Sequence, residues 1–158
     1  MEFLKIQQNA LKNWFEVKTK DRAVIYKYCE NENGFCITDN KAIFIIPKCF
    51  WLLGNDEEGL FKKDPNHIGR VLKEPSDLRQ FEKTSRIEII KDYSKPITAI
   101  VLETKYGDTL TAYVDKKYLE MFDDNCAIRG TRPDYPLYIY ENRGENLSLA
   151  GIIMPVVK

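Results

Sequence analysis

Histidine is almost absent from this chain, with His67 the only one among 158 residues. A Ser-His or Cys-His catalytic pair would have to use it. His67 stands in a polar stretch with no catalytic motif around it, so we expect an ordinary surface histidine. The four cysteines contain no Cys-x-x-Cys spacing, and His67 has no spaced partner, so a zinc site is not expected.

Phosphate-binding and cation-binding motifs are missing too. The chain has no glycine-rich phosphate loop and no dinucleotide-binding fingerprint. The acidic groups at residues 56–58 and 123–124 lack the spacing of a calcium loop, so we expect them in solvated loops. Hydrolase, kinase and oxidoreductase functions therefore have no supporting motif. We expect a protein that is not an enzyme and that carries no cofactor or metal.

Long apolar runs are also missing. No stretch approaches the roughly 20 apolar residues that a membrane-spanning helix needs. Residues 1–8 lack the basic segment and apolar stretch of a signal peptide. The cysteines Cys29, Cys36, Cys49 and Cys126 suit a reduced interior better than a disulfide framework. These features predict a cytoplasmic protein that does not contact a membrane.

Charge of one sign is not in excess, because 24 Lys+Arg residues offset 24 Asp+Glu residues. The total charge therefore does not indicate a strongly basic nucleic-acid binder. Hydrophobic residues make up 44% of the chain and aromatic residues 12%, which is enough for a sizeable core. We expect one domain over residues 1–158 with an α+β fold, an antiparallel sheet with short helices on one face.

The first half of this domain is expected over residues 1–53. Residues 3–15 predict an amphipathic helix. Its apolar side would hold Phe3, Leu4, Ile6, Ala10, Leu11, Trp14 and Phe15, and its polar side Lys5, Gln8, Asn9, Lys12 and Asn13. Strands at 22–30 and 34–39, a third strand at 41–46 and a short helix at 48–53 would follow.

A hairpin turn at residues 31–34 would set Cys29 opposite Cys36 and Glu30 opposite Phe35. Directly opposed cysteines are within reach of a disulfide bond, although in a strained geometry. The alternative is a pair of small, half-buried thiols. Both interpretations fit the sequence, and the second is the simpler.

Residues 54–84 predict an irregular connection, with a short strand at 71–73 and a helix at 77–83 capped by Ser76. The second half is expected over residues 85–158. Its predicted strands are 85–92, 97–104, 109–114, 126–130, 136–141 and 147–154. Asp115 would cap a helix over 116–122 whose lysines face outward.

The amino-acid sequence of residues 109–156 resembles the closing segment of a bacterial DNA sliding clamp subunit. The matching segments are Val114-Asp-Lys-Lys-Tyr-Leu119, Asp134-Tyr-Pro-Leu-Tyr-Ile-Tyr-Glu141 and Ile152-Ile-Met-Pro-Val156. The resemblance implies a domain in which helix 3–15 and helix 116–122 are equivalent. The chain has room for one such domain, whereas the clamp subunit has three, and the middle section has no counterpart in the family.

By this resemblance, the two helices would touch the phosphates of duplex DNA without reading sequence. The residues that would face DNA are Lys5, Gln8, Asn9, Lys12, Lys116 and Lys117. A solvated helix face with ordinary lysines is the simpler alternative. The resemblance also implies an apolar site for short linear peptides, lined by Met154, Pro155 and Val156. There the simpler alternative is a terminal strand that completes the sheet.

The function implied is a sliding-clamp-like module in DNA replication or repair. Its partners would be duplex DNA, replication proteins or short linear peptides, and copies would join into a homo-oligomer through sheet edges. The alternative is a protein-interaction or accessory module, typical of a phage or mobile element, which keeps the fold without binding DNA.

Overall fold

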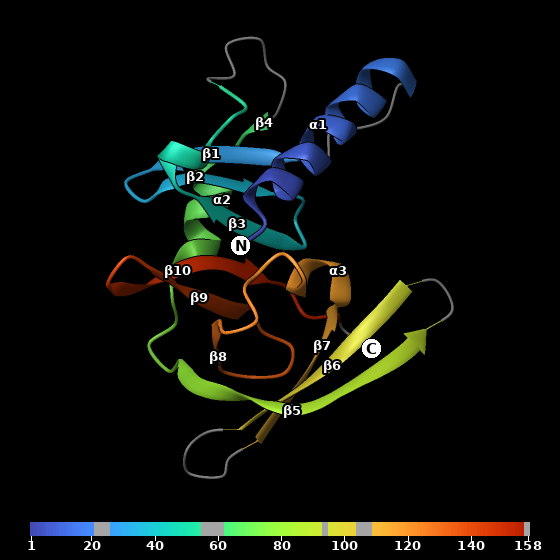
Figure 1. Cartoon of the computed structure of the whole chain (residues 1–158), viewed down its shortest axis with the longest axis vertical. Coiled ribbons are helices and arrows are strands. Elements are labelled where there is room, and N and C mark those ends of the chain that lie inside the picture. The colour runs from blue at the N-terminus through green and yellow to red at the C-terminus, as the bar shows by residue number, and fades with distance from the viewer. Residues whose placement is uncertain (21–25, 55–61, 93–94, 104–108, 157–158) are drawn as a thin grey trace. The chain divides into compact units, whose positions relative to one another are not determined.

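The computed structural model describes residues 1–20, 26–54, 62–92, 95–103 and 109–156 (Figure 1). The chain forms two compact units. The N-terminal unit comprises Glu2–Lys73, and the C-terminal unit comprises Met1 with Glu74–Lys158. Helices and β-sheet occur in both units, so the fold is α+β as predicted. That the two units make one clamp-like domain stays a prediction.

The N-terminal unit combines a long helix with a small sheet. Its elements in chain order are α1 (Phe3–Lys20), β1 (Lys27–Asn31), β2 (Gly34–Thr38), β3 (Ala42–Ile46), the 3-10 helix η1 (Lys48–Phe50), β4 (Lys62–Lys63) and α2 (Pro65–Leu72). Strands β1, β2 and β3 form an antiparallel meander, and β4 runs parallel to β1. Every residue of β2 and β3 is buried, which suits the unbroken apolar run of β3.

The β1–β2 hairpin has the predicted register. Cys29 pairs with Cys36 and Glu30 with Phe35. Asn31 and Gly34 also pair, so the turn itself is only two residues long. Gly34 has a φ of 142°, and a Cβ atom there would lie 2.2 Å from the carbonyl oxygen of Ile46. Only glycine fits this position without displacing β3.

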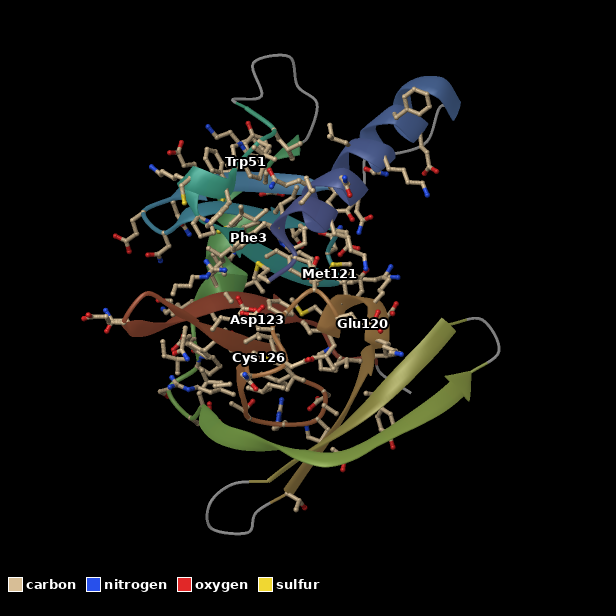
Figure 2. The ribbon with its side chains drawn as sticks, in the orientation of Figure 1. Phe3, Trp51, Glu120, Met121, Asp123 and Cys126 are labelled. Carbon is tan, nitrogen blue, oxygen red and sulfur yellow. The ribbon has the colours of Figure 1, made fainter. Side chains whose placement is uncertain are left out.

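The segment after β3 connects the hairpin to the beginning of α1. Trp51 stacks on Phe35 at 4.3 Å between ring centroids, and the Tyr28 ring lies 6.4 Å from Trp51. Phe3 of α1, which is labelled in Figure 2, stacks on Phe50 at 4.8 Å between ring centroids. The segment after β3 therefore packs against the first turn of α1 through Phe50 and against one face of the hairpin through Trp51.

The irregular connection predicted for residues 54–84 is wrong where the structure describes it. Residues 65–72 form α2, because Asp64 accepts a hydrogen bond from the His67 N–H at 3.2 Å and Pro65 occupies the first helical position. The predicted strand at 71–73 is therefore the end of a helix and the residue after it. The predicted helix at 77–83 is also wrong, since a strand begins at Arg79. Residues 55–61 lie outside the described residues.

The C-terminal unit contains an antiparallel sheet of six described strands. Its elements are β5 (Arg79–Asp92), β6 (Lys95–Glu103), β7 (Thr109–Asp115), α3 (Lys116–Leu119), β8 (Ala127–Gly130), β9 (Leu137–Arg143) and β10 (Asn146–Ile153). Hydrogen-bonded neighbours follow the order β10-β9-β8-β5-β6-β7. The 14-residue strand β5 serves two partners, first β8 and then β6, and its register with β6 shifts between Lys83 and Ile87. It curves visibly in Figure 1.

The sheet of the C-terminal unit is rolled. The Val156 N–H donates to the Tyr113 carbonyl at 2.7 Å, which joins the segment after β10 to β7. In a flat sheet these two strands would be about 24 Å apart, as five spacings of about 4.8 Å. The three residues from Ile153 to Val156 span at most about 10 Å. The two strands must therefore approach each other, as in a partly closed barrel.

The predicted last strand, 147–154, is shifted by one residue along the chain. Strand β10 ends at Ile153, and Met154, Pro155 and Val156 belong to no strand. The helix predicted over 116–122 is also shorter, because α3 ends at Leu119 and a turn follows. The predicted buried side holds for Tyr118, Met121 and Phe122. Strands β6 to β9 lie within two residues of their predicted bounds, whereas β5 begins at Arg79, six residues before its predicted start at residue 85.

Both units contain the same succession of elements. In the N-terminal unit, α1 is followed by the antiparallel meander β1-β2-β3. In the C-terminal unit, α3 is followed by the antiparallel meander β8-β9-β10. Helix α1 and helix α3 thus each precede a three-stranded meander in the chain order.

Candidate interaction surface

Helix α1 buries a mixed stripe of side chains. The buried positions are Ile6, Gln7, Ala10 and Asn13. Gln7 accepts a hydrogen bond from the Leu52 N–H at 2.7 Å and donates to the Phe50 carbonyl at 2.9 Å. This amide satisfies two backbone groups of the segment after β3, which explains why a polar residue occupies a buried position. Asn13 was predicted on the outer face and is instead buried.

The opposite side of α1 presents apolar side chains to solvent. Leu4 is 57% exposed, Leu11 42% and Phe15 60%, whereas the sequence pattern placed all three inward. Their spacing of seven and four residues puts them on one face of the helix. We call Leu4, Leu11 and Phe15 the α1 stripe. Scattered exposed apolar residues are ordinary, whereas these three are aligned on one face of a single helix.

A polar row lies beside the α1 stripe. It consists of Lys5, Gln8, Asn9 and Lys12, all exposed as predicted. At about 100° per residue these four side chains share one face of α1, next to Leu11 and Phe15. The predicted DNA-facing residues of this helix are therefore gathered together. Lys116 and Lys117 belong to the other unit.

The lysines of α3 are matched by carboxylates. Lys116 lies 3.3 Å from Glu120, and the Lys117 ammonium lies 4.0 Å from Asp115 and 4.5 Å above the Tyr118 ring. Asp115 also caps the helix by accepting the Lys117 N–H at 3.1 Å. Glu120 and Asp123 flank the end of the helix (Figure 2). Residues 115–124 hold two lysines and four acidic residues, and the Met1 ammonium pairs with Asp123, so this surface carries a small excess of negative charge, which does not favour phosphate.

The loop after α3 is held by a buried acid from β9. Glu141 is 3% exposed, and its carboxylate accepts the Asp123 N–H at 2.7 Å. Glu141 ends one of the segments on which the sliding-clamp prediction rests. In this chain its contact is structural, because it fixes the course of the backbone beyond α3.

The predicted peptide-binding residues are placed on the segment after β10. Met154 and Pro155 are half-buried, and Val156 is 36% exposed. The backbone of Val156 is hydrogen-bonded to β7, as described above. The segment therefore lies against its own unit, and its apolar side chains are only partly open to a ligand.

The part of the chain that the structure describes has no cluster of side chains typical of a metal-binding site. No group of three or more His, Cys, Asp or Glu residues there could hold a metal ion. His67 is half-buried in α2, where its backbone N–H donates to the side chain of the capping residue Asp64. That hydrogen bond, with the nearby Lys27 ammonium at 3.4 Å, lowers the pKa of Asp64. The described helices include none that is long and apolar enough to cross a bilayer.

Comparison of the chain with protein-family models, with curated proteins and with solved structures gives no significant match. The surface features of α1 and α3 therefore carry the functional argument.

Proposed function

We propose that this chain is a non-enzymatic, sliding-clamp-like binding module of DNA replication or repair in the cytoplasm, and that α1 docks a protein partner. The observation that carries the proposal is the α1 stripe. Partner proteins bind such helix faces by covering a few apolar anchors. The equivalent chain order of α1 with its meander and α3 with its meander supports the link to clamp-type modules.

Duplex DNA is the second candidate partner, and the polar row of α1 favours it. Lys5 and Lys12 are exposed on one face, and Gln8 and Asn9 between them can donate to phosphate oxygens. The acidic surface around α3 argues against it, because a clamp uses both helices. Two lysines on one helix release few counterions, so DNA affinity would be weak at physiological salt.

A DNA-binding assay separates the two candidates. Fluorescence anisotropy with a random-sequence duplex, measured across a salt series, is expected to show no binding at physiological salt. A variant with Lys5, Lys12, Lys116 and Lys117 all changed to alanine is expected to behave like the wild type. Binding that weakens with salt and disappears in this variant would favour the DNA partner and count against the protein partner.

A matched pair of α1 variants tests the protein partner. Peptides selected from a random display library against the wild-type chain would be measured against Leu11→Lys and Asn9→Lys. Both positions are exposed on α1 and gain the same charge. We expect the selected peptides to bind Leu11→Lys about tenfold more weakly or worse and Asn9→Lys about as well as the wild type. Equal binding to both variants would show that the α1 stripe is not the docking site.

A further inference from the structure

Two of the four cysteines face each other across a strand pair. Cys29 of β1 and Cys36 of β2 are direct partners in the antiparallel register. Directly opposed residues project to the same side of the sheet, and their Cα atoms are about 4.5–5.5 Å apart. A disulfide bond accepts Cα separations of about 4.4–6.8 Å. The hairpin therefore brings the two sulfur atoms within bonding reach without moving the backbone far.

Both thiols are buried, but their surroundings differ. Cys29 is 4% exposed, while Cys36 is fully buried. The Asn31 side-chain amide donates to the Cys36 sulfur at 3.2 Å. The pKa of Cys29 is lowered, chiefly because the Cys36 thiol donates a hydrogen bond to it, with a smaller contribution from the Lys63 charge. Burial and the Asp64 carboxylate oppose this shift.

We propose that Cys29 and Cys36 form a reversible disulfide by exchange with a small-molecule disulfide such as glutathione disulfide. The Cys29 thiolate attacks one sulfur of the external disulfide, and one glutathione leaves as its thiolate. Cys36 then gives its proton to the departing glutathione thiolate and attacks the Cys29 sulfur, which releases the second glutathione as a thiolate that takes a proton from water. Two protein thiols are oxidised, and one external disulfide is reduced to two thiols.

The Asn31 amide assists the second step, because a hydrogen bond to the Cys36 sulfur stabilises the thiolate that must attack. The other two cysteines lack such an arrangement. Cys49 is exposed and Cys126 is buried, and neither lies opposite a cysteine in the described strand pairs. The disulfide closes an eight-residue hairpin whose register is already set, so oxidation covalently locks β1 to β2. This device is independent of the function proposed for α1.

The test is thiol trapping in glutathione redox buffers. The native chain would be equilibrated over a range of ratios of glutathione to glutathione disulfide, quenched in acid and alkylated under denaturing conditions. Trypsin releases residues 28–41 as one peptide containing both cysteines. We expect this peptide to lose two hydrogens and both alkyl labels as the buffer becomes oxidising, and to regain them on return to a reducing buffer. If the peptide keeps both labels in fully oxidised buffer, or gains only glutathione, the proposal is wrong.

Single variants test the order of events. Cys36→Ser removes the resolving thiol, so glutathione should remain attached to Cys29. Cys29→Ser should leave Cys36 unmodified, because it is fully buried and loses the thiol that attacks first. Cys126→Ser is the control and should leave the oxidation of peptide 28–41 unchanged. Glutathione attached equally in both hairpin variants would overturn the assignment of Cys29 as the attacking thiol, and circular dichroism of each variant checks that it folds.

Discussion

The side chain of Gln7 accepts the backbone N–H of Leu52 at 2.7 Å, which ties the first turns of α1 to the segment after β3. Gln7→Ala removes this acceptor and also the donor to the Phe50 carbonyl, so two backbone groups lose their partner. We expect a loss of about 2 kcal/mol in the free energy of unfolding. Urea unfolding followed by circular dichroism measures it. Gln8→Ala, at an exposed position of the same helix, should change stability by no more than about 0.5 kcal/mol. Equal effects at both positions would contradict the role of Gln7.

A second prediction concerns two glycines at hairpin turns, Gly34 directly after the β1–β2 turn and Gly144 within the β9–β10 turn. Gly34→Ala places a Cβ atom 2.2 Å from the Ile46 carbonyl oxygen and should destabilise the N-terminal unit by about 3 kcal/mol. Gly144 also has a positive φ, 75°, but an added Cβ meets no atom within 4 Å. Gly144→Ala should therefore cost only the backbone strain, about 1 kcal/mol. Thermal unfolding of the two variants compares the cost of steric overlap with the cost of backbone strain alone. A larger loss of stability in Gly144→Ala than in Gly34→Ala would contradict the prediction.

The sequence predicts the strands of this chain better than it predicts the helices. Alternation and turn residues locate the hairpin with Cys29 opposite Cys36, because two short strands and one tight turn leave little choice of register. Helix α2 was missed, although Asp64-Pro65 is a cap followed by a proline at the first helical position. The polar residues before it favour a loop, so the capping signal does not stand out in the sequence.

The inner face of α1 could not be identified from its apolar residues. The helix carries two candidate stripes, one with Ile6 and Ala10 and one with Leu4, Leu11 and Phe15. The more apolar stripe is exposed, since the buried one is selected by the two hydrogen bonds of Gln7 to a segment more than 40 residues away. Such a distant polar partner leaves no periodic trace in the sequence.

The orientation of α1 yields a third prediction. Ile6 is 2% exposed, whereas Leu11 is 42% exposed. Ile6→Ala should lower the free energy of unfolding by about 2–4 kcal/mol, through lost burial and the cavity that remains. Leu11→Ala should stay within about 0.5 kcal/mol of the wild type. Chemical denaturation of both variants shows which of the two stripes of α1 is buried. A larger loss at Leu11 would restore the orientation expected from the apolar pattern.

The fourth prediction separates capping from charge at the beginning of α3. Asp115→Ala removes the acceptor of the Lys117 N–H and should cost about 1 kcal/mol. Asp115→Asn keeps a capping oxygen but loses the charge opposite the Lys117 ammonium, and should cost much less. Guanidinium unfolding curves of the two variants measure the difference. If asparagine costs as much as alanine, the contact with the lysine charge matters more than the cap.

The last prediction tests whether the segment after β10 holds the rolled sheet closed. Val156→Pro removes the N–H that donates to the Tyr113 carbonyl, while Val156→Ala keeps it and loses only a partly exposed side chain. We expect the proline variant to lose about 1 kcal/mol of stability and the alanine variant to lose little. Amide hydrogen exchange in β7 supplies the local readout, because its exchange should speed up in the proline variant alone. Unchanged exchange in both variants would mean that pairing with β6 suffices to hold β7 in place, and that the contact with Val156 adds nothing to the closure of the sheet.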